Sequence, residues 1–217
     1  MSIKNNLTHI KTTLPEHVTL VAVSKTKPVS DLMEAYEAGQ RIFGENKIQE
    51  MAEKWEQMPK DIQWHMIGHV QTNKVKFMAP FVSLIHGVDS LKLLQEINKQ
   101  AQKNNRIIDC LLQIYIAEEE TKFGLDQEEL ASLLSSNEFK ELKNIRIVGL
   151  MGMATFTDNK DQIKKEFLHL KSIFDSFAIH NPQFATLSMG MSGDYQLAIE
   201  CGSTMVRIGS SIFGGRN

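Results

Sequence analysis

Short apolar segments that alternate with amphipathic ones constrain the fold of this chain more than any other feature. The apolar segments have the length of strands that are buried inside a sheet. The segments between them repeat apolar residues at helical spacing, as in residues 31–38, 89–101, 127–134 and 162–177. We therefore predict strands at residues 18–23, 41–44, 64–67, 84–87, 107–116, 145–151, 186–189 and 205–208.

The regular alternation of strand and helix predicts an α/β fold with a parallel sheet, at roughly 27 residues per unit. The count of eight favours a closed (β/α)₈ barrel of the TIM type, formed by residues 1–217 as a single domain. A doubly wound open sheet is the structural alternative, because periodicity does not distinguish a closed sheet from an open one. Residues 1–15 are expected to add an amphipathic helix, with Ile3, Leu7 and Ile10 on its apolar stripe.

Composition and charge exclude several classes of protein. The formal net charge is −2, so no basic footprint points to nucleic acid. No apolar run approaches the length of a membrane span, and residues 1–17 lack the apolar centre of a signal peptide. Cys110 and Cys201 stand inside apolar patterns without CxxC spacing. We expect buried, reduced thiols in a cytoplasmic protein.

Lys25 stands at the end of the first predicted strand, after Val23 and Ser24. The sequence Thr26-Lys27-Pro28 ends that strand, because proline removes a backbone donor and restricts the residue before it. The lysine is thereby placed at the rim of the sheet, where α/β folds carry their chemistry. An amine in a partly apolar pocket could act as a Schiff-base nucleophile. An ordinary lysine at a strand edge is the alternative.

Two loops near the C-terminus are suited to a phosphate group. Residues 209–211, after the last strand, read Gly-Ser-Ser, and residues 188–194, after the seventh strand, contain two glycines and two serines. Barrels often bind phosphate in the loops after strands seven and eight, where backbone amides converge. Arg207 lies near the end of the last strand and could meet an anionic or acceptor group there. A glycine-rich turn with a structural arginine remains the alternative.

Other polar residues near strand ends have weaker patterns. Asn46 follows the second strand and could bond a ligand oxygen, whereas Glu45 could be a carboxylate at a helix start. His65, His69 and His86 lack the spacing of zinc ligands, so we expect no metal site. We expect His65 to be a packed histidine.

Taken together, these motifs resemble the YggS/PROSC family, the pyridoxal phosphate homeostasis proteins. Their single domain is similar to the N-terminal barrel domain of bacterial alanine racemase. The resemblance covers nearly the whole chain, although residues 69–70 read His-Val where many relatives have proline-leucine. The segments that carry it are residues 21–25 (VAVSK), 43–46 (FGEN), 64–68 (WHMIG), 71–74 (QTNK), 149–153 (GLMGM), 188–192 (SMGMS) and 202–209 (GSTMVRIG).

The resemblance implies a pyridoxal 5′-phosphate site. Lys25 would form the internal aldimine with this cofactor, Asn46 would lie near the hydroxyl side of its ring, and Arg207 would face the pyridine nitrogen. The phosphate would be held by Ser192, Gly209 and Ser210, partly through backbone amides. No catalytic residue is assigned.

An arginine beside the pyridine nitrogen disfavours protonation of that nitrogen and weakens the cofactor as an electron sink. In alanine racemase, by resemblance, a tyrosine from a second domain of the partner subunit compensates as a catalytic base. This chain ends at Asn217, and none of Tyr36, Tyr115 and Tyr195 matches that base. We therefore predict a carrier that holds pyridoxal phosphate reversibly and maintains vitamin B6 homeostasis.

Several functional questions stay open at this stage. A weak pyridoxal-phosphate-dependent racemase and a Schiff-base aldolase acting on a phosphorylated sugar are the alternatives to the carrier. Apoenzymes that use pyridoxal phosphate are possible recipients, and the protein is expected to be a monomer. Lys122 could be a transient second amine or an ordinary solvated loop lysine.

Overall fold

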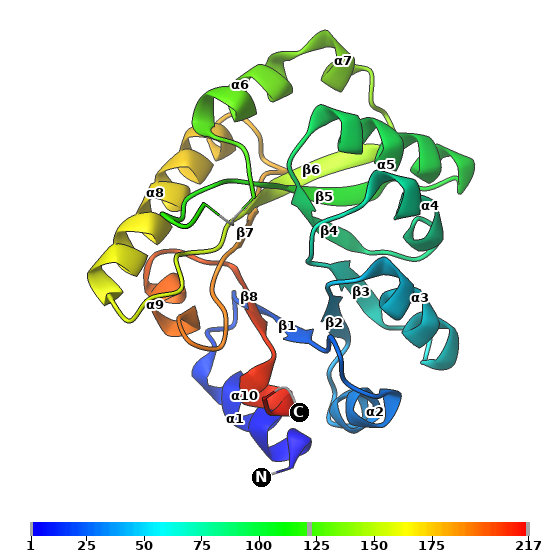
Figure 1. The fold of residues 1–217 in the computed structure, drawn as a ribbon, viewed down its shortest axis with the longest axis vertical. Helices are drawn as coiled ribbons and strands as arrows, with labels where there is room; N and C mark the ends of the chain where they lie inside the picture. Colours follow the sequence, from blue (N-terminus) through cyan, green and yellow to red (C-terminus); the bar gives the residue numbers. More distant parts are fainter. Residues whose placement is uncertain (1, 121–122, 216–217) are drawn as a thin grey trace.

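Parallel strands close into a barrel in which each strand pairs with the next along the chain and β8 pairs with β1 (Figure 1). This computed structural model describes residues 2–120 and 123–215. The prediction of a closed (β/α)₈ barrel is confirmed, and the open sheet is wrong because no open edge separates β1 from β8 in the described barrel. The strands are β1 Thr19–Val23, β2 Ile42–Glu45, β3 Gln63–Met66, β4 Leu84–Val88, β5 Ile108–Gln113, β6 Ile145–Met151, β7 Thr186–Ser188 and β8 Met205–Ile208.

Helices surround the barrel (Figure 1). Their boundaries follow local capping signals: Ser90 accepts a hydrogen bond from the backbone N–H of Leu93, and Asp126 forms a capping box with Glu129. The helices are α1 Ile3–Thr13, α2 Val29–Glu37, α3 Ile48–Gln57, α4 Val75–Met78, α5 Leu91–Lys103, α6 Gln127–Ser135, α7 Asn137–Lys140, α8 Lys160–Ala178, α9 Tyr195–Glu200 and α10 Ser210–Phe213, with a 3₁₀ turn η1 at Thr72–Lys74.

The fifth predicted strand, residues 107–116, was too long. Ile107 is 62% exposed and precedes the strand, while Ile114 makes only an isolated bridge to Leu125. Ile114 and Ile116 are nevertheless buried. Their apolar character therefore reflects packing of the loop after β5 against the core rather than continuation of the strand.

The predicted N-terminal helix is α1, and it packs beside α10, so that the two ends of the described chain lie together (Figure 1). Leu7 and Ile10 are buried, as the apolar stripe predicts, and Ile3 is partly buried against them. The side chain of Asn6 donates a hydrogen bond to the carbonyl of Ile212 at 3.0 Å. These contacts tie α10, which follows the last strand, to the start of the chain.

Strand residues alternate between two cores. Leu20 and Ala22 of β1 belong to the large core between strands and helices, whereas Val21 belongs to a small cluster inside the barrel. Cys110 and Cys201 are both buried, as predicted, and burial raises the pKa of each thiol.

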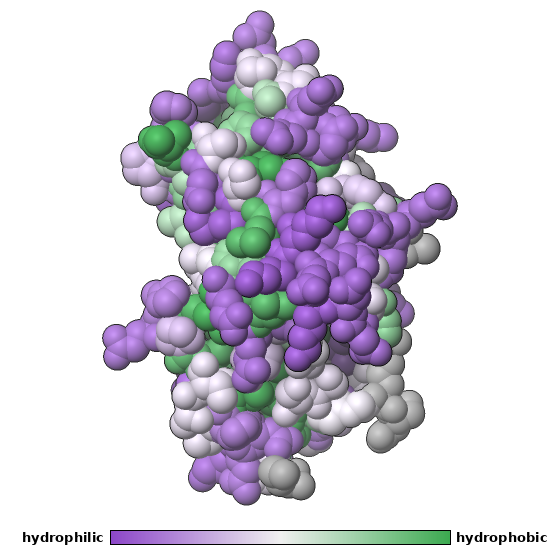
Figure 2. Space-filling model, turned by 90° about the vertical axis from the view of Figure 1, so that its left-hand side faces the viewer, coloured by the Kyte–Doolittle hydropathy of each residue, from purple (hydrophilic) through white to green (hydrophobic). Residues whose placement is uncertain are grey.

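The outer face on the α8 side is mostly hydrophilic, and its hydrophobic residues form separate small patches (Figure 2). None of the helices in residues 2–120 and 123–215 has the length and apolar character that crossing a membrane requires.

Candidate functional site

A cavity of about 710 Å³ opens at the carboxyl ends of the strands. Its walls come from the loops that follow β1, β2, β3, β5, β6, β7 and β8. The residues expected to bind a cofactor all line it, although they are far apart in the sequence: Lys25, Asn46, Ser192, Arg207, Gly209 and Ser210. The barrel topology therefore brings the whole predicted set to one place.

Lys25 lies in a tight turn directly after β1. The backbone N–H of Lys27 donates to the carbonyl of Ser24 at 3.1 Å, so Lys25 and Thr26 are the central residues of this turn. Thr26 has a φ of 63°, in the left-handed region. Pro28 then stands at the N-terminus of α2. The turn reverses the chain at the rim and leaves Lys25 lining the cavity.

The loops after β7 and β8 meet at Ser192. Its hydroxyl oxygen accepts hydrogen bonds from the backbone N–H of Gly209 at 3.3 Å and of Ser211 at 3.4 Å. Asp194, which precedes α9, accepts a bond from the backbone N–H of Met191 at 2.6 Å. The Ser192 hydroxyl and backbone amides from the loop after β8 therefore converge on one point of the rim.

Arg207 extends from β8 into the buried base of the cavity. Its guanidinium donates to the Oγ of Ser188 at 2.6 Å and to the carbonyl of Gly152 at 3.2 Å. Burial lowers the pKa of Arg207 to about 10, and the negative charge of Asp194 opposes that shift. The arginine therefore remains a cation at neutral pH.

A hydrogen-bonded chain continues below Arg207 through the barrel interior. His86 Nδ1 lies 3.0 Å from Ser188 Oγ, and His86 Nε2 lies 2.9 Å from His65 Nδ1. Because arginine only donates, the Ser188 hydroxyl oxygen accepts from it, and the Ser188 O–H can donate a hydrogen bond to His86 Nδ1. In that arrangement His86 Nε2–H donates to His65. The expectation that His65 packs in the interior is confirmed.

Both histidines of this hydrogen-bonded chain, His65 and His86, are held neutral. Burial lowers the pKa of His65 to about 3. Burial also lowers the pKa of His86 well below its usual value, and the electrostatic influence of His65 and Arg207 acts in the same direction. Arg207 is therefore supported through neutral acceptors rather than through a carboxylate. Their sequence context predicted no role beside Arg207 for Ser188 or His86, although each is a polar residue on a buried strand, which is a detectable signal.

The loops after β2 and β3 approach each other closely at Asn46. A Cβ atom on Gly68 would lie 2.4 Å from the carbonyl oxygen of Asn46, so only glycine fits there. His69 follows Gly68, lines the cavity and stacks on Phe123 with ring centroids 4.7 Å apart, while Val70 is buried. Of these two residues that depart from the pattern of many relatives, His69 thus forms part of the rim. Lys122 lies outside the described residues.

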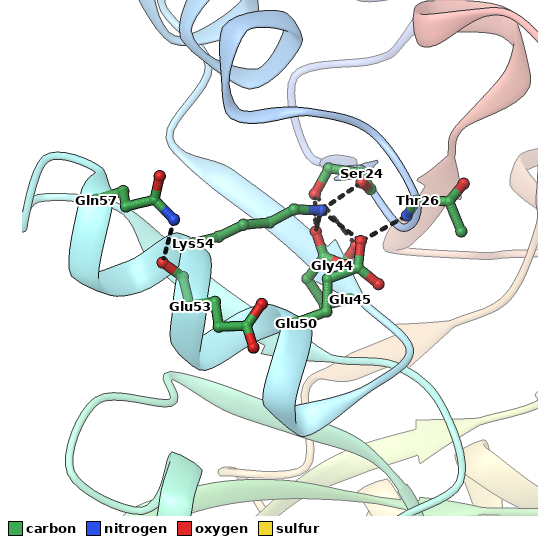
Figure 3. A network of polar contacts seen from close by, with 8 residues as sticks. All are labelled: Ser24, Thr26, Gly44, Glu45, Glu50, Glu53, Lys54 and Gln57. Atoms are coloured by element: carbon green, nitrogen blue, oxygen red, sulfur yellow. Dashed lines mark hydrogen bonds and ion pairs between the residues drawn. The ribbon is translucent and has the colours of Figure 1, made fainter.

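A second polar network lies outside the barrel wall, between β1, β2 and α3 (Figure 3). Lys54 donates to Glu45 and to Glu50, each at 2.7 Å, and to the carbonyl of Ser24 at 2.8 Å. Glu45 is the last residue of β2 and fully buried, so the suggestion that it starts a helix is wrong. Desolvation raises the pKa of Glu45, and the charge of Lys54 opposes that shift.

Potential metal ligands do not cluster in the part of the chain that the structure describes: no group of three or more His, Cys, Asp or Glu side chains is positioned to hold a metal ion. The charged side chains that line the cavity are those of Lys25, Lys27 and Arg207 together with Asp158 and Asp194.

Comparison with known families bears directly on this site. The alanine racemase N-terminal domain family matches residues 1–217. A pyridoxal phosphate homeostasis protein of Aquifex aeolicus is 40% identical over 199 residues, which cover 91% of this chain and 86% of the relative. The chain belongs to the pyridoxal phosphate homeostasis protein family. Another member, from Vibrio alginolyticus, is 39% identical over 235 residues, covering 100% of this chain and 98% of the relative.

Solved structures include a closely similar one. PipY of Synechococcus elongatus, with pyridoxal phosphate bound, is 32% identical and has a TM-score of 0.89. The alignment covers 98% of this chain and 100% of PipY. The barrel of this chain therefore matches the fold of PipY over nearly the whole length of both proteins.

Proposed function

We propose that this protein binds pyridoxal 5′-phosphate at the carboxyl rim of the barrel, holds it reversibly through Lys25 and thereby maintains vitamin B6 homeostasis. The observation that carries the proposal is the convergence of Lys25, Arg207 and Ser192 on one cavity. The names of its relatives and the bound cofactor of PipY support the choice of ligand.

The residues of the cavity fit the chemical groups of this cofactor. The Ser192 hydroxyl and the backbone amides of Gly209 and Ser210 would hold the phosphate. A Cβ on Gly209 would lie 3.1 Å from the carbonyl oxygen of Val23, so a larger residue here would crowd the end of β1 beside the proposed phosphate site. Asn46 would lie on the hydroxyl side of the ring. The cavity volume, about 710 Å³, is within the range of small-molecule sites.

Lys25 supplies the reversible bond. Its amine would add to the aldehyde carbon with loss of water, and hydrolysis of the resulting Schiff base returns both partners unchanged. When bound, pyridoxal phosphate supplies an electron sink for amino-acid chemistry, and the strength of that sink depends on protonation of its ring nitrogen.

Arg207 weighs against efficient catalysis. A guanidinium donates hydrogen bonds and carries no lone pair that could keep a proton on the ring nitrogen. Its own support is a chain of neutral groups, Ser188, His86 and His65. We therefore propose a carrier rather than a weak racemase, which would have to exchange the α-proton of an amino acid at enzyme-like rates. We further propose that the carrier is a cytoplasmic monomer that delivers the cofactor to apoenzymes.

Borohydride reduction followed by peptide mapping tests the proposal directly. Incubation of the purified protein with pyridoxal phosphate should give a pyridoxyl group on Lys25 that is lost in Lys25→Ala. Lys27→Ala is the matched control, because Lys27 lines the same cavity but donates to the carbonyl of Gly215 at 2.9 Å. An unmodified Lys25 with label on Lys27 would refute the proposal, and a trapped phosphorylated sugar would favour the aldolase.

A further inference from the structure

The turn that carries Lys25 has a backbone conformation that its sequence does not favour. Thr26, the third residue of the turn, has a φ of 63°. Turns with a positive φ at this position usually have glycine or asparagine there, because a branched Cβ crowds the backbone. Such a conformation persists only where the surrounding structure holds it.

Helix α3 provides the groups that hold this turn. Glu50 Oε1 accepts a hydrogen bond from the backbone N–H of Thr26 at 2.6 Å, and Lys54 Nζ donates to the carbonyl of Ser24 at 2.8 Å. Both side chains therefore bind the backbone, one on each side of Lys25 (Figure 3).

The two helix residues are also fixed with respect to each other. They are one helical turn apart, and Lys54 Nζ lies 2.7 Å from Glu50 Oε1. The side chain of Lys54 is 7% exposed and its second carboxylate partner, Glu45, is 0% exposed. Charge-assisted bonds that are shielded from water in this way are stronger than exposed ones. The network can therefore impose a conformation on the turn.

We infer that Glu50 and Lys54 are positioning residues for Lys25, which hold the turn in its left-handed form and so keep the Lys25 side chain directed into the cavity. Among the described residues that line the cavity, neither Glu50 nor Lys54 is present, so both act through the backbone of Ser24 and Thr26. The inference rests on the proposed function of Lys25 and extends it to residues outside the site.

Amide hydrogen exchange in the cofactor-free, full-length protein tests the first step. Glu50→Ala should speed exchange of the Thr26 amide about tenfold or more, which corresponds to about 1.4 kcal/mol. Glu53→Ala is the matched control on the same helix, because Glu53 is exposed and its carboxylate accepts from the side chain of Gln49. It should leave exchange at Thr26 unchanged.

The rate of Lys25 attachment to pyridoxal phosphate, followed by absorbance, tests the second step. Glu50→Ala should slow attachment about tenfold, whereas Glu53→Ala should not. Adding Thr26→Gly to Glu50→Ala should restore the rate to within about twofold, because glycine adopts a positive φ without support. Loss of general stability would not be rescued at residue 26.

Each outcome decides a separate point. Unchanged exchange at Thr26 in Glu50→Ala, or a slow attachment that Thr26→Gly does not restore, would overturn the positioning role. If the unmodified protein formed no bond at Lys25, the proposed function would be refuted, and so would positioning for the cofactor. The exchange measurement would then still show whether Glu50 holds the turn.

Discussion

Two buried polar networks support two residues of the same cavity, Lys25 and Arg207. One network consists of ion pairs, and the other surrounds a cation with neutral groups. Outside the barrel wall, Lys54 pairs with Glu45 and Glu50 and holds the backbone around Lys25. Inside the barrel, Arg207 rests on a chain of neutral groups that ends at His65. The first network uses ionic bonds to fix a backbone, and the second keeps a cation without a carboxylate partner in its chain.

The difference between the networks corresponds to the two tasks that we propose for the cavity. A lysine that attaches and releases a cofactor needs a defined position, which rigid ionic contacts provide. An arginine facing a ring nitrogen must not help to protonate it. A carboxylate in the place of Ser188 would bring a negative charge to this part of the cavity, which favours the protonated ring. The neutral histidines therefore suit a protein that holds the cofactor.

Removal of Lys54 should give the largest effect on stability. Lys54→Met leaves Glu45 buried without its cationic partner, and breaking a buried pair in this way costs about 3–5 kcal/mol of unfolding free energy. Denaturant unfolding measures this loss. The combined change Lys54→Met and Glu45→Gln should recover part of it, because the unpaired charge is then also removed.

A surface lysine provides the control for this experiment. Lys99 lies 3.9 Å from Glu96, and its side chain is 63% exposed, so Lys99→Met should change the unfolding free energy by less than about 1 kcal/mol. Equal losses of unfolding free energy in Lys54→Met and Lys99→Met would show that the buried ion pairs of Lys54 do not stabilise the fold.

Removal of Ser188 should have the next largest effect, because it cuts the neutral chain where it meets the cation. Ser188→Ala takes away the acceptor for Arg207 and should cost about 1.5–3 kcal/mol of unfolding free energy. Ser203→Ala is the control: Ser203 is equally buried but donates to the carbonyl of Met189, a neutral contact that contributes about 1 kcal/mol. A smaller loss at Ser188 than at Ser203 would contradict the description of Arg207 as dependent on this chain.

The sequence predicts the barrel and the rim residues better than it predicts either network. Strand and helix periods fix which residues are buried, and the closed topology then brings residues such as Lys25 and Arg207 together. The networks depend on register and on side-chain direction. His65 and His86 face each other only because β3 and β4 are neighbours with that pairing, and Glu45 points to α3 rather than into the cavity. Neither relation is visible in local spacing.

The pH dependence of stability should show a smaller effect that separates the networks further. The pKa of His65 is lowered to about 3 in the folded protein, whereas an unfolded histidine titrates near its usual 6.5. Below pH 6.5 the unfolded chain therefore binds more protons than the folded one, and stability is lost as the pH falls from 6.5 toward 3. Between pH 7 and pH 5 this single residue should account for about 2 kcal/mol of the loss.

Unfolding measured at several pH values should give a shallower decline of the unfolding free energy for His65→Gln than for the unmodified protein. His17→Gln, at an exposed position, should follow the unmodified protein. A parallel decline in all three proteins would mean that His65 takes up a proton in the folded state, and the chain beneath Arg207 would then be charged rather than neutral.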